Sequence, residues 1–127
     1  MLDRACAPSL LLIAPTGGGK TLAGFLPSLT ELADGCHAGL HTLYVSPLKA
    51  LAADIKRNLR SPVDEIGLPI RIEDRTGDTS ATKRKRQRAD PPHILLTTPE
   101  SLALLISYED APRMFAGLQR VIVDEIH

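Results

Sequence analysis

The sequence predicts an α/β fold in which a parallel sheet is covered by helices on both faces. The main observation is that five short apolar runs, rich in β-forming residues, alternate with segments of helical periodicity, as in successive βαβ units. In addition, 127 residues with 43% hydrophobic and 24% charged side chains suit one globular domain. The predicted strands are Leu10–Ala14, Thr42–Ser46, Ile70–Asp74, His93–Thr97 and Arg120–Asp124.

The segments between these runs are predicted to be the covering helices. Leu22, Phe25, Leu26 and Leu29 recur at helical spacing, and a similar apolar stripe extends over residues 48–59. A polar helix over 79–89 and an apolar helix over 99–108 connect the later strands. The run 121–123 has the pattern of a buried strand, and little sequence follows it, so we expect a piece of a longer protein.

Charge and hydropathy limit the functional classes. Fifteen Lys and Arg balance fifteen Asp and Glu, so no overall field attracts DNA or an anionic membrane, and a polyanion must be bound locally. The apolar runs are far shorter than the roughly 20 residues that cross a bilayer, and no secretory signal is present. We expect a cytoplasmic protein with no membrane partner and with Cys6 and Cys36 reduced.

The most specific motif is a glycine-rich loop between the first strand and the first helix. Three glycines let backbone N–H groups converge on a phosphate, the lysine adds a point charge, and the threonine hydroxyl can ligate Mg²⁺. A plain glycine-rich turn is the alternative. Alanine replaces the first glycine of the general pattern, which disfavours a GTPase. The predicted nucleotide-binding residues are Ala14, Pro15, Thr16, Gly17, Gly18, Gly19, Lys20 and Thr21.

A second group of candidate metal-binding and catalytic residues follows the last predicted strand. Asp124 stands where phosphate-binding-loop proteins place a carboxylate that directs Mg²⁺, and Glu125 is predicted to accept a proton from the water that attacks the γ-phosphate. Without the glycine-rich loop, such an acidic pair is usually a solvated turn. His127 is a candidate sensor that links the phosphate to another site, although a lone histidine is more often structural.

Three further turns are expected at the same sheet edge. Ser46-Pro47 and Thr98-Pro99 each have a hydroxyl residue at the predicted N-cap and proline at the first helical position, and Thr76-Gly77-Asp78 follows the third strand. Ligands of open parallel sheets bind beyond the carboxyl ends of the strands. Taken singly, each turn is explained by helix capping. Together they suggest a track for a polymer of phosphates.

The only dense charge run extends over residues 83–88. We interpret it as a solvated basic helix, with nucleic-acid binding or nuclear import as the alternative. The chain has only four aromatic residues, two of them in predicted core elements, so no base-stacking platform is expected.

These motifs, in this order, resemble motifs I, Ia, Ib, Ic and II of superfamily 2 (DEAD/DEAH-box) helicases, and the resemblance covers nearly the whole chain. The versions Ser46-Pro47-Leu48-Lys49-Ala50-Leu51 and Asp124-Glu125-Ile126-His127 are similar to Lhr-type (large helicase-related) helicases, including the ligase-associated DEXH-box branch. The resemblance implies a RecA-like P-loop NTPase fold for residues 1–127, as part of the first of two lobes. The second lobe, with its arginine finger, would be absent from these residues.

The resemblance also implies residue roles. ATP would bind at residues 17–21, Mg²⁺ would bind Thr21 and Asp124, Lys20 and Glu125 would serve catalysis, and His127 would couple hydrolysis to strand binding. The segments that would hold the backbone of the tracking strand contain Pro47, Lys49, Gly77, Asp78, Thr98 and Pro99. The implied function is ATP-dependent translocation along single-stranded or partly duplex DNA, related to DNA repair, with little or no hydrolysis by these residues alone.

Three alternatives stay open. An RNA helicase would use the same phosphate contacts, because only contacts to the 2′-hydroxyl distinguish the sugars. The second alternative is a fragment that binds nucleotide or nucleic acid without turning over ATP. A metabolic P-loop kinase or transport ATPase would explain Lys20 and Asp124, but it would leave the turns at Ser46 and Thr98 unexplained.

Overall fold

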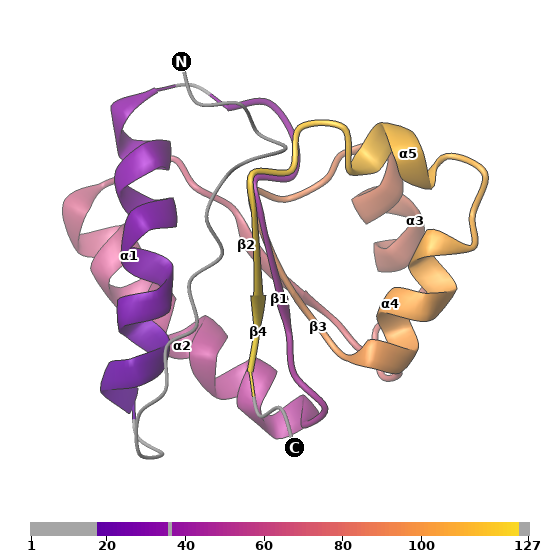
Figure 1. Cartoon of the computed structure of the whole chain (residues 1–127), viewed down its shortest axis with the longest axis horizontal. Coiled ribbons are helices and arrows are strands. Elements are labelled where there is room, and N and C mark those ends of the chain that lie inside the picture. Colours follow the sequence, from indigo (N-terminus) through magenta and orange to yellow (C-terminus); the bar gives the residue numbers. More distant parts are fainter. Residues whose placement is uncertain (1–17, 36, 125–127) are drawn as a thin grey trace.

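The computed structural model describes residues 18–35 and 37–124, and it confirms the predicted parallel sheet (Figure 1). Four strands form one sheet in the order β2-β3-β1-β4, and every neighbouring pair is parallel. The predicted strand Leu10–Ala14 lies outside the described residues. The strands are β1 (Thr42–Val45), β2 (Ile72–Arg75), β3 (Ile94–Thr97) and β4 (Arg120–Val123).

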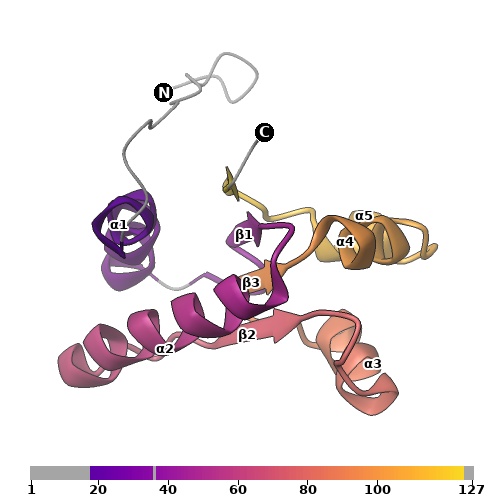
Figure 2. The same ribbon diagram turned by 90° about the horizontal axis from the view of Figure 1, so that it is seen from below.

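Helices cover both faces of the sheet, as predicted. α1 and α2 lie on one side, and α3, α4 and α5 lie on the other (Figure 2). α5 was not anticipated, because four residues are too few to show a helical period. Within the described ranges, none of these helices is both long and apolar enough to cross a membrane. The helices are α1 (Gly18–Asp34), α2 (Lys49–Ile66), α3 (Ala81–Ala89), α4 (Pro99–Ile106) and α5 (Ala111–Met114).

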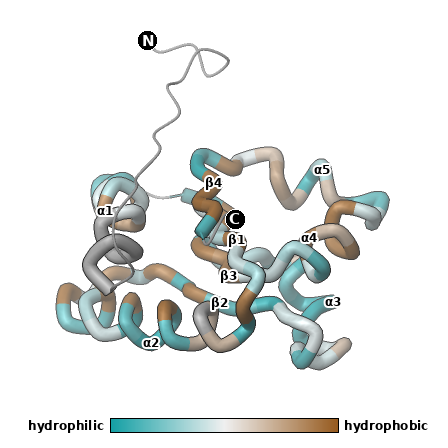
Figure 3. The backbone as a smooth tube through the Cα atoms, turned by 60° about the horizontal axis from the view of Figure 1, so that its bottom comes forward, coloured by the Kyte–Doolittle hydropathy of each residue, from teal (hydrophilic) through white to brown (hydrophobic). Residues whose placement is uncertain are grey.

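Alternation along the strands divides the apolar core in two. Tyr44 and Leu96 face α1 and α2, whereas Leu43 and Leu95 face α4 and α5. The strands in the middle of the sheet are therefore largely hydrophobic, while α3 is hydrophilic (Figure 3). This three-layer packing leaves the strand ends free to form a site.

The expectation that 121–123 is a buried strand is only partly correct. Ile122 packs against the core on the α1 side, but the side chains of Val121 and Val123 are 52% and 54% exposed. The reason is that α4 and α5 pack against Leu43 and Leu95, on β1 and β3, and leave that face of β4 open.

A polar network, buried at Ser28, His41 and Thr42 and exposed at Glu31, joins α1 to the sheet. The Arg120 guanidinium on β4 donates to Ser28 Oγ at 3.0 Å and to Glu31 Oε1 at 2.7 Å, both on α1. His41 Nε2 lies 2.9 Å from Glu31 Oε2, and the Thr42 hydroxyl donates to Ser28 Oγ at 2.7 Å. The Arg120 hydrogen bond lowers the pKa of Glu31, whereas burial lowers the pKa of His41. The network sets the position of α1 relative to β1 and β4.

Truncating Leu95 tests the packing of the α4 face. Leu95 is fully buried, so Leu95→Ala should lower the free energy of unfolding by about 2–5 kcal/mol in urea denaturation. The matched control is Ile66→Ala at the end of α2, where the side chain is 69% exposed and the loss should stay within about 0.5 kcal/mol. Equal losses in the two variants would contradict this packing.

Candidate functional site

The site lies at the edge of the sheet where the strands end. Because all four strands are parallel, the segments that follow them emerge at the same edge, shown at the bottom of Figure 1. Backbone hydrogen bonds hold these ends side by side: Asp124 N–H donates to the Val45 carbonyl at 2.9 Å, and Ser46 N–H donates to the Thr97 carbonyl at 3.0 Å.

The first turn of α1 lies at this same edge (Figure 1). Gly18, Gly19, Lys20 and Thr21 form its helical backbone, and the free N–H groups of such a turn favour an anion. The predicted loop residues Ala14, Pro15, Thr16 and Gly17 lie outside the described residues, as do Glu125 and His127. The described backbone therefore brings two predicted parts of a nucleotide site, the start of α1 and Asp124, to one end of the molecule.

Tyr44 anchors the Asp124 carboxylate. The Tyr44 hydroxyl donates to Asp124 Oδ2 at 2.8 Å, and the tyrosine ring is fully buried against Phe25 of α1, with ring centroids 5.6 Å apart. The bond places the carboxylate on the face of the sheet that α1 covers. No role for Tyr44 was predicted from the sequence. The available signal was that a tyrosine in a buried strand needs a partner for its hydroxyl.

The Asp124 carboxylate fits a magnesium ion with few protein ligands better than a metal ion held by several protein side chains. No group of three or more His, Cys, Asp or Glu among residues 18–35 and 37–124 could hold a metal ion. Mg²⁺ commonly binds through one or two carboxylates together with substrate phosphates and water. A single anchored carboxylate at the same end of the molecule as a helix N-terminus therefore agrees with Mg²⁺ that arrives with a nucleotide.

A groove of about 320 Å³ joins three of the predicted turns. Of the six residues predicted from the sequence to contact a nucleic-acid backbone, four line this groove. The fifth, Asp78, lies 3.1 Å from Lys49 Nζ. Pro99, the sixth, is the exposed first residue of α4. The sequence analysis missed Arg84, Glu100, Ser101 and Leu104, because their position depends on how α3 and α4 pack. The groove is lined by Pro47, Lys49, Gly77, Arg84, Thr98, Glu100, Ser101 and Leu104.

Local hydrogen bonds shape the turn after β3 as predicted, but not the turn after β1. Thr98 Oγ1 accepts from Ser101 N–H at 3.4 Å, so Thr98 is the N-cap of α4 and Pro99 is its first residue. The predicted N-cap at Ser46 is wrong. Ser46 Oγ accepts from Leu48 N–H at 3.3 Å, which closes a tight turn and delays the start of α2 to Lys49.

The turn after β2 is also held by side-chain oxygens. Thr79 Oγ1 accepts from Thr76 N–H at 2.9 Å, and Thr76 Oγ1 accepts from Asp78 N–H at 3.2 Å. These bonds keep residues 76–79 out of α3, which begins at Ala81 after the N-cap Ser80. Gly77 is thereby presented to the groove.

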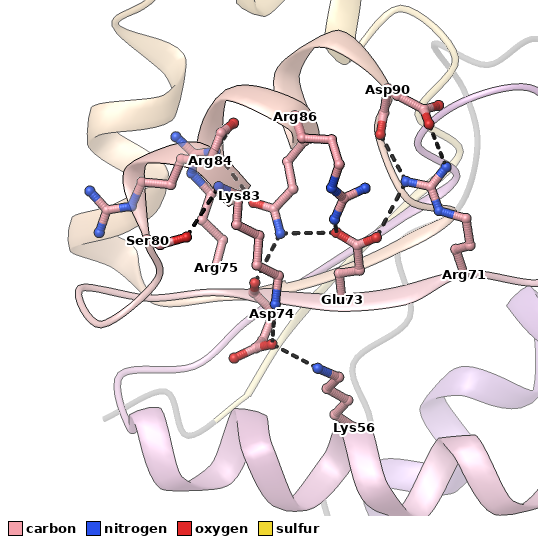
Figure 4. A network of polar contacts seen from close by, with 11 residues as sticks. Lys56, Arg71, Glu73, Asp74, Arg75, Ser80, Lys83, Arg84, Arg86 and Asp90 are labelled. Atoms are coloured by element: carbon pink, nitrogen blue, oxygen red, sulfur yellow. Dashed lines mark hydrogen bonds and ion pairs between the residues drawn. The ribbon is translucent and has the colours of Figure 1, made fainter.

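An ion-pair network behind this turn joins β2 to α2 and α3 (Figure 4). Arg86 contacts Glu73 at 2.6 Å, and Asp74 contacts Lys56 at 3.0 Å and Lys83 at 3.4 Å. Burial alone would raise the pKa of both carboxyls. Hydrogen bonds and positive charges outweigh it, so the pKa of Glu73 and the pKa of Asp74 are both lowered.

The interpretation of residues 83–88 as a solvated basic helix is only partly correct: Lys85 and Arg86 are exposed, but three of the five charges also pair with acids. Lys83 and Arg86 pair with carboxylates of β2, and Gln87 is buried. Arg88 lies 3.5 Å from Asp110 and stacks 3.9 Å from the centroid of the Tyr108 ring. Two of the acidic partners, Glu73 and Asp74, are consecutive residues of β2, and the third, Asp110, comes just before α5, so a hydrophobic pattern gives no sign of these pairs. Most of this positive charge therefore stabilises the fold.

The chain matches a family model. Residues 3–127 match the model of the DEAD/DEAH box helicase family.

Curated relatives are similar over almost all of this chain. An Lhr helicase/probable uracil glycosylase of Mycolicibacterium smegmatis is 47% identical over 92% of the chain, and an ATP-dependent helicase Lhr-Core of Methanocaldococcus jannaschii is 42% identical over 94%. The chain spans only 9% and 16% of the lengths of these two relatives.

Solved structures of helicases are also similar to this chain. The Mycobacterium smegmatis helicase Lhr bound to single-stranded DNA and AMP-PNP superposes with a TM-score of 0.76 at 46% identity, over 88% of this chain and 15% of that chain. The helicase MrfA bound to DNA and AMPPNP gives a TM-score of 0.77 at 36% identity, over 89% and 16%.

The lowered pKa of Glu73 predicts an acid-sensitive fold. A carboxyl with a folded pKa below its unfolded value of about 4.5 stabilises the protein above that value, and the stabilisation is lost as the pH falls through the folded pKa. Glu73→Gln should lower the free energy of unfolding by about 1–3 kcal/mol at pH 7. The difference from wild type should shrink as the pH falls from 5 towards 3.

Urea denaturation at several pH values provides the measurement, and the exposed Glu65→Gln on α2 is the control. A constant difference between wild type and Glu73→Gln at every pH would show that the charge of Glu73 does not stabilise the fold.

Proposed function

Because this chain belongs to the DEAD/DEAH box helicase family, we propose that it forms part of the ATP-driven motor of an Lhr-type helicase. Residues 1–127 would contribute motifs I, Ia, Ib, Ic and II of the first RecA-like lobe, and a second lobe of the same protein would complete the motor. The observation that best supports the proposal is the position of the first turn of α1 and of Asp124 at one edge and one face of the sheet.

In this proposal the start of α1 binds the phosphates of ATP. Residues 14–19 supply backbone N–H groups, and Lys20 and Thr21 supply an ammonium group and a hydroxyl. Thr21 and Asp124 are the residues that would hold Mg²⁺, which supplies charge neutralisation at the phosphates when it is bound. Tyr44 orients the Asp124 carboxylate.

Two residues after β4 complete the proposed catalytic set. Glu125 accepts a proton from the attacking water, and His127 couples hydrolysis to binding of the strand. An arginine from the second lobe stabilises the transition state in related motors, so hydrolysis by residues 1–127 alone would be very weak.

The groove is the proposed path of the tracking strand. Pro47, Lys49 and Gly77 line it, together with Thr98, the N-cap of α4. With Asp78 and Pro99, these residues would contact the sugar-phosphate backbone, so binding would be insensitive to base sequence and would weaken as salt rises.

We propose single-stranded or partly duplex DNA as the substrate, a role related to DNA repair, and action in the cytoplasm. The solved Lhr structure contains single-stranded DNA, which favours DNA over RNA for this chain. Comparing the stimulation of the full-length ATPase by DNA and by RNA oligonucleotides tests this choice. Stronger stimulation by RNA would identify an RNA helicase instead.

Replacing Lys20 tests the nucleotide site. In the full-length protein, Lys20→Ala should abolish ATP hydrolysis and ATP-driven unwinding, because the phosphates lose their point charge, while single-stranded DNA is still bound. Hydrolysis and unwinding assays measure the loss, and Lys85→Ala on the exposed face of α3 is the control. Unchanged hydrolysis by Lys20→Ala would refute the assignment. If Glu125→Gln hydrolyses ATP as the wild type does, the proposed base is wrong.

Removing the Tyr44 hydroxyl tests the metal site. Groups that orient a metal ligand commonly change metal affinity by 10–100-fold. Tyr44→Phe should therefore raise the Mg²⁺ concentration that gives half-maximal ATPase activity by about tenfold, with a smaller effect at saturating Mg²⁺. Tyr108→Phe, a partly exposed tyrosine beyond α4, is the matched control. The same Mg²⁺ dependence in wild type and Tyr44→Phe would show that this hydrogen bond does not serve the site.

A further inference from the structure

We propose that Arg84 of α3 supplies the uncompensated positive charge that holds a backbone phosphate in the groove. The inference rests on the proposed function, because it assumes that the groove receives a nucleic-acid strand. It adds a residue from outside the three turns predicted from the sequence and identifies the ligand group as a phosphodiester.

The groove cannot attract a phosphate through Lys49 alone. Lys49 Nζ lies 3.1 Å from Asp78 Oδ2, so a carboxylate already offsets its charge. Glu100, another lining residue, adds a negative charge at the start of α4. Without a further cation, the lining of the groove would repel a polyanion.

Arg84 is the other cation that lines the groove. In the basic run, Lys83, Arg86 and Arg88 each lie within 4.0 Å of a carboxylate. Lys85 has no such ion pair in the described part of the chain, but it does not line the groove. Among residues 18–35 and 37–124, no carboxylate lies within that distance of Arg84. The Arg84 side chain is directed away from the Glu73 and Asp74 carboxylates (Figure 4). Its positive charge is therefore not offset by an ion pair.

The Arg84 guanidinium is also fixed before a ligand arrives. One terminal nitrogen donates to the Thr76 carbonyl at 2.7 Å, in the turn that presents Gly77 to the groove. The Arg84 carbonyl in turn accepts from the buried guanidinium of Arg75 at 3.0 Å. Arg84 Nε is a buried donor with no hydrogen-bond partner in the described part of the chain. A guanidinium held in place loses less conformational entropy when it binds a phosphate.

A purely structural role for Arg84, holding the turn at Thr76, is the competing explanation. The two roles differ in their salt dependence. A contact with a phosphate of a single strand contributes about 0.7 to the slope of log K against log salt concentration, whereas a bond to a carbonyl contributes nothing to that slope.

The test measures the affinity of the full-length protein for a fluorescent single-stranded DNA oligonucleotide by anisotropy over a range of NaCl concentrations. Arg84→Gln should weaken binding about tenfold at low salt and should lower the slope by about 0.7. Arg84→Lys keeps the charge and should keep the wild-type slope. Lys85→Gln, which removes the adjacent exposed charge, should leave the slope unchanged.

Each outcome of these binding measurements either supports or overturns the proposed role of Arg84. A wild-type slope for Arg84→Gln, or an equal fall for Lys85→Gln, would overturn it and leave the proposed function intact. If Arg84→Gln melts at a much lower temperature, all slopes are measured at a temperature at which every variant stays folded, and the slope of folded Arg84→Gln decides: a fall of about 0.7 supports the phosphate contact and a wild-type slope overturns it. Failure of the wild type to bind single-stranded DNA, or to be stimulated by it, would refute the proposed function and this inference together.

Discussion

The parallel pairing of the four strands among the described residues is the constraint on which the site depends. Parallel strands require each connection to return across a face of the sheet, so every strand ends at the same edge and every following segment emerges there. That edge receives Asp124, the turns after β1, β2 and β3, and the start of α1. The start and the end of the described chain thus come to the same edge of the sheet.

Hydrogen bonds and ion pairs then set the positions of groups at that edge. Arg120 fixes α1 through Ser28 and Glu31 at the far edge of the sheet, while Tyr44 fixes the Asp124 carboxylate at the near edge. The Arg120 contacts join α1 to β4, and the Tyr44 hydrogen bond joins β1 to the residue that follows β4. The placement of α1 and of Asp124 relative to the sheet therefore depends on polar contacts as well as on apolar packing.

The sequence analysis succeeded where periodicity and local chemistry decide the outcome. Alternating apolar runs predict the strands, and the hydroxyl-proline pair Thr98-Pro99 predicts the start of α4. It failed where a side chain had two local choices or a distant partner. Ser46 closes a turn instead of capping a helix, and Lys83, Arg86 and Arg88 pair with acids that lie outside α3. Roles for Tyr44 and Arg84 needed the fold.

By itself the sequence determined the fold class, the helicase family and the residue types that each strand end presents, because these follow from hydrophobic period, glycine placement and motif order. Only the tertiary structure decided which charges remain available at the groove. The charge of Lys49 is offset by Asp78 and the rest of the basic run is largely paired with acids, while Arg84 has no such pair in the described part. The physical reason is that charge compensation depends on distances of a few ångströms between elements, which a sequence pattern does not specify.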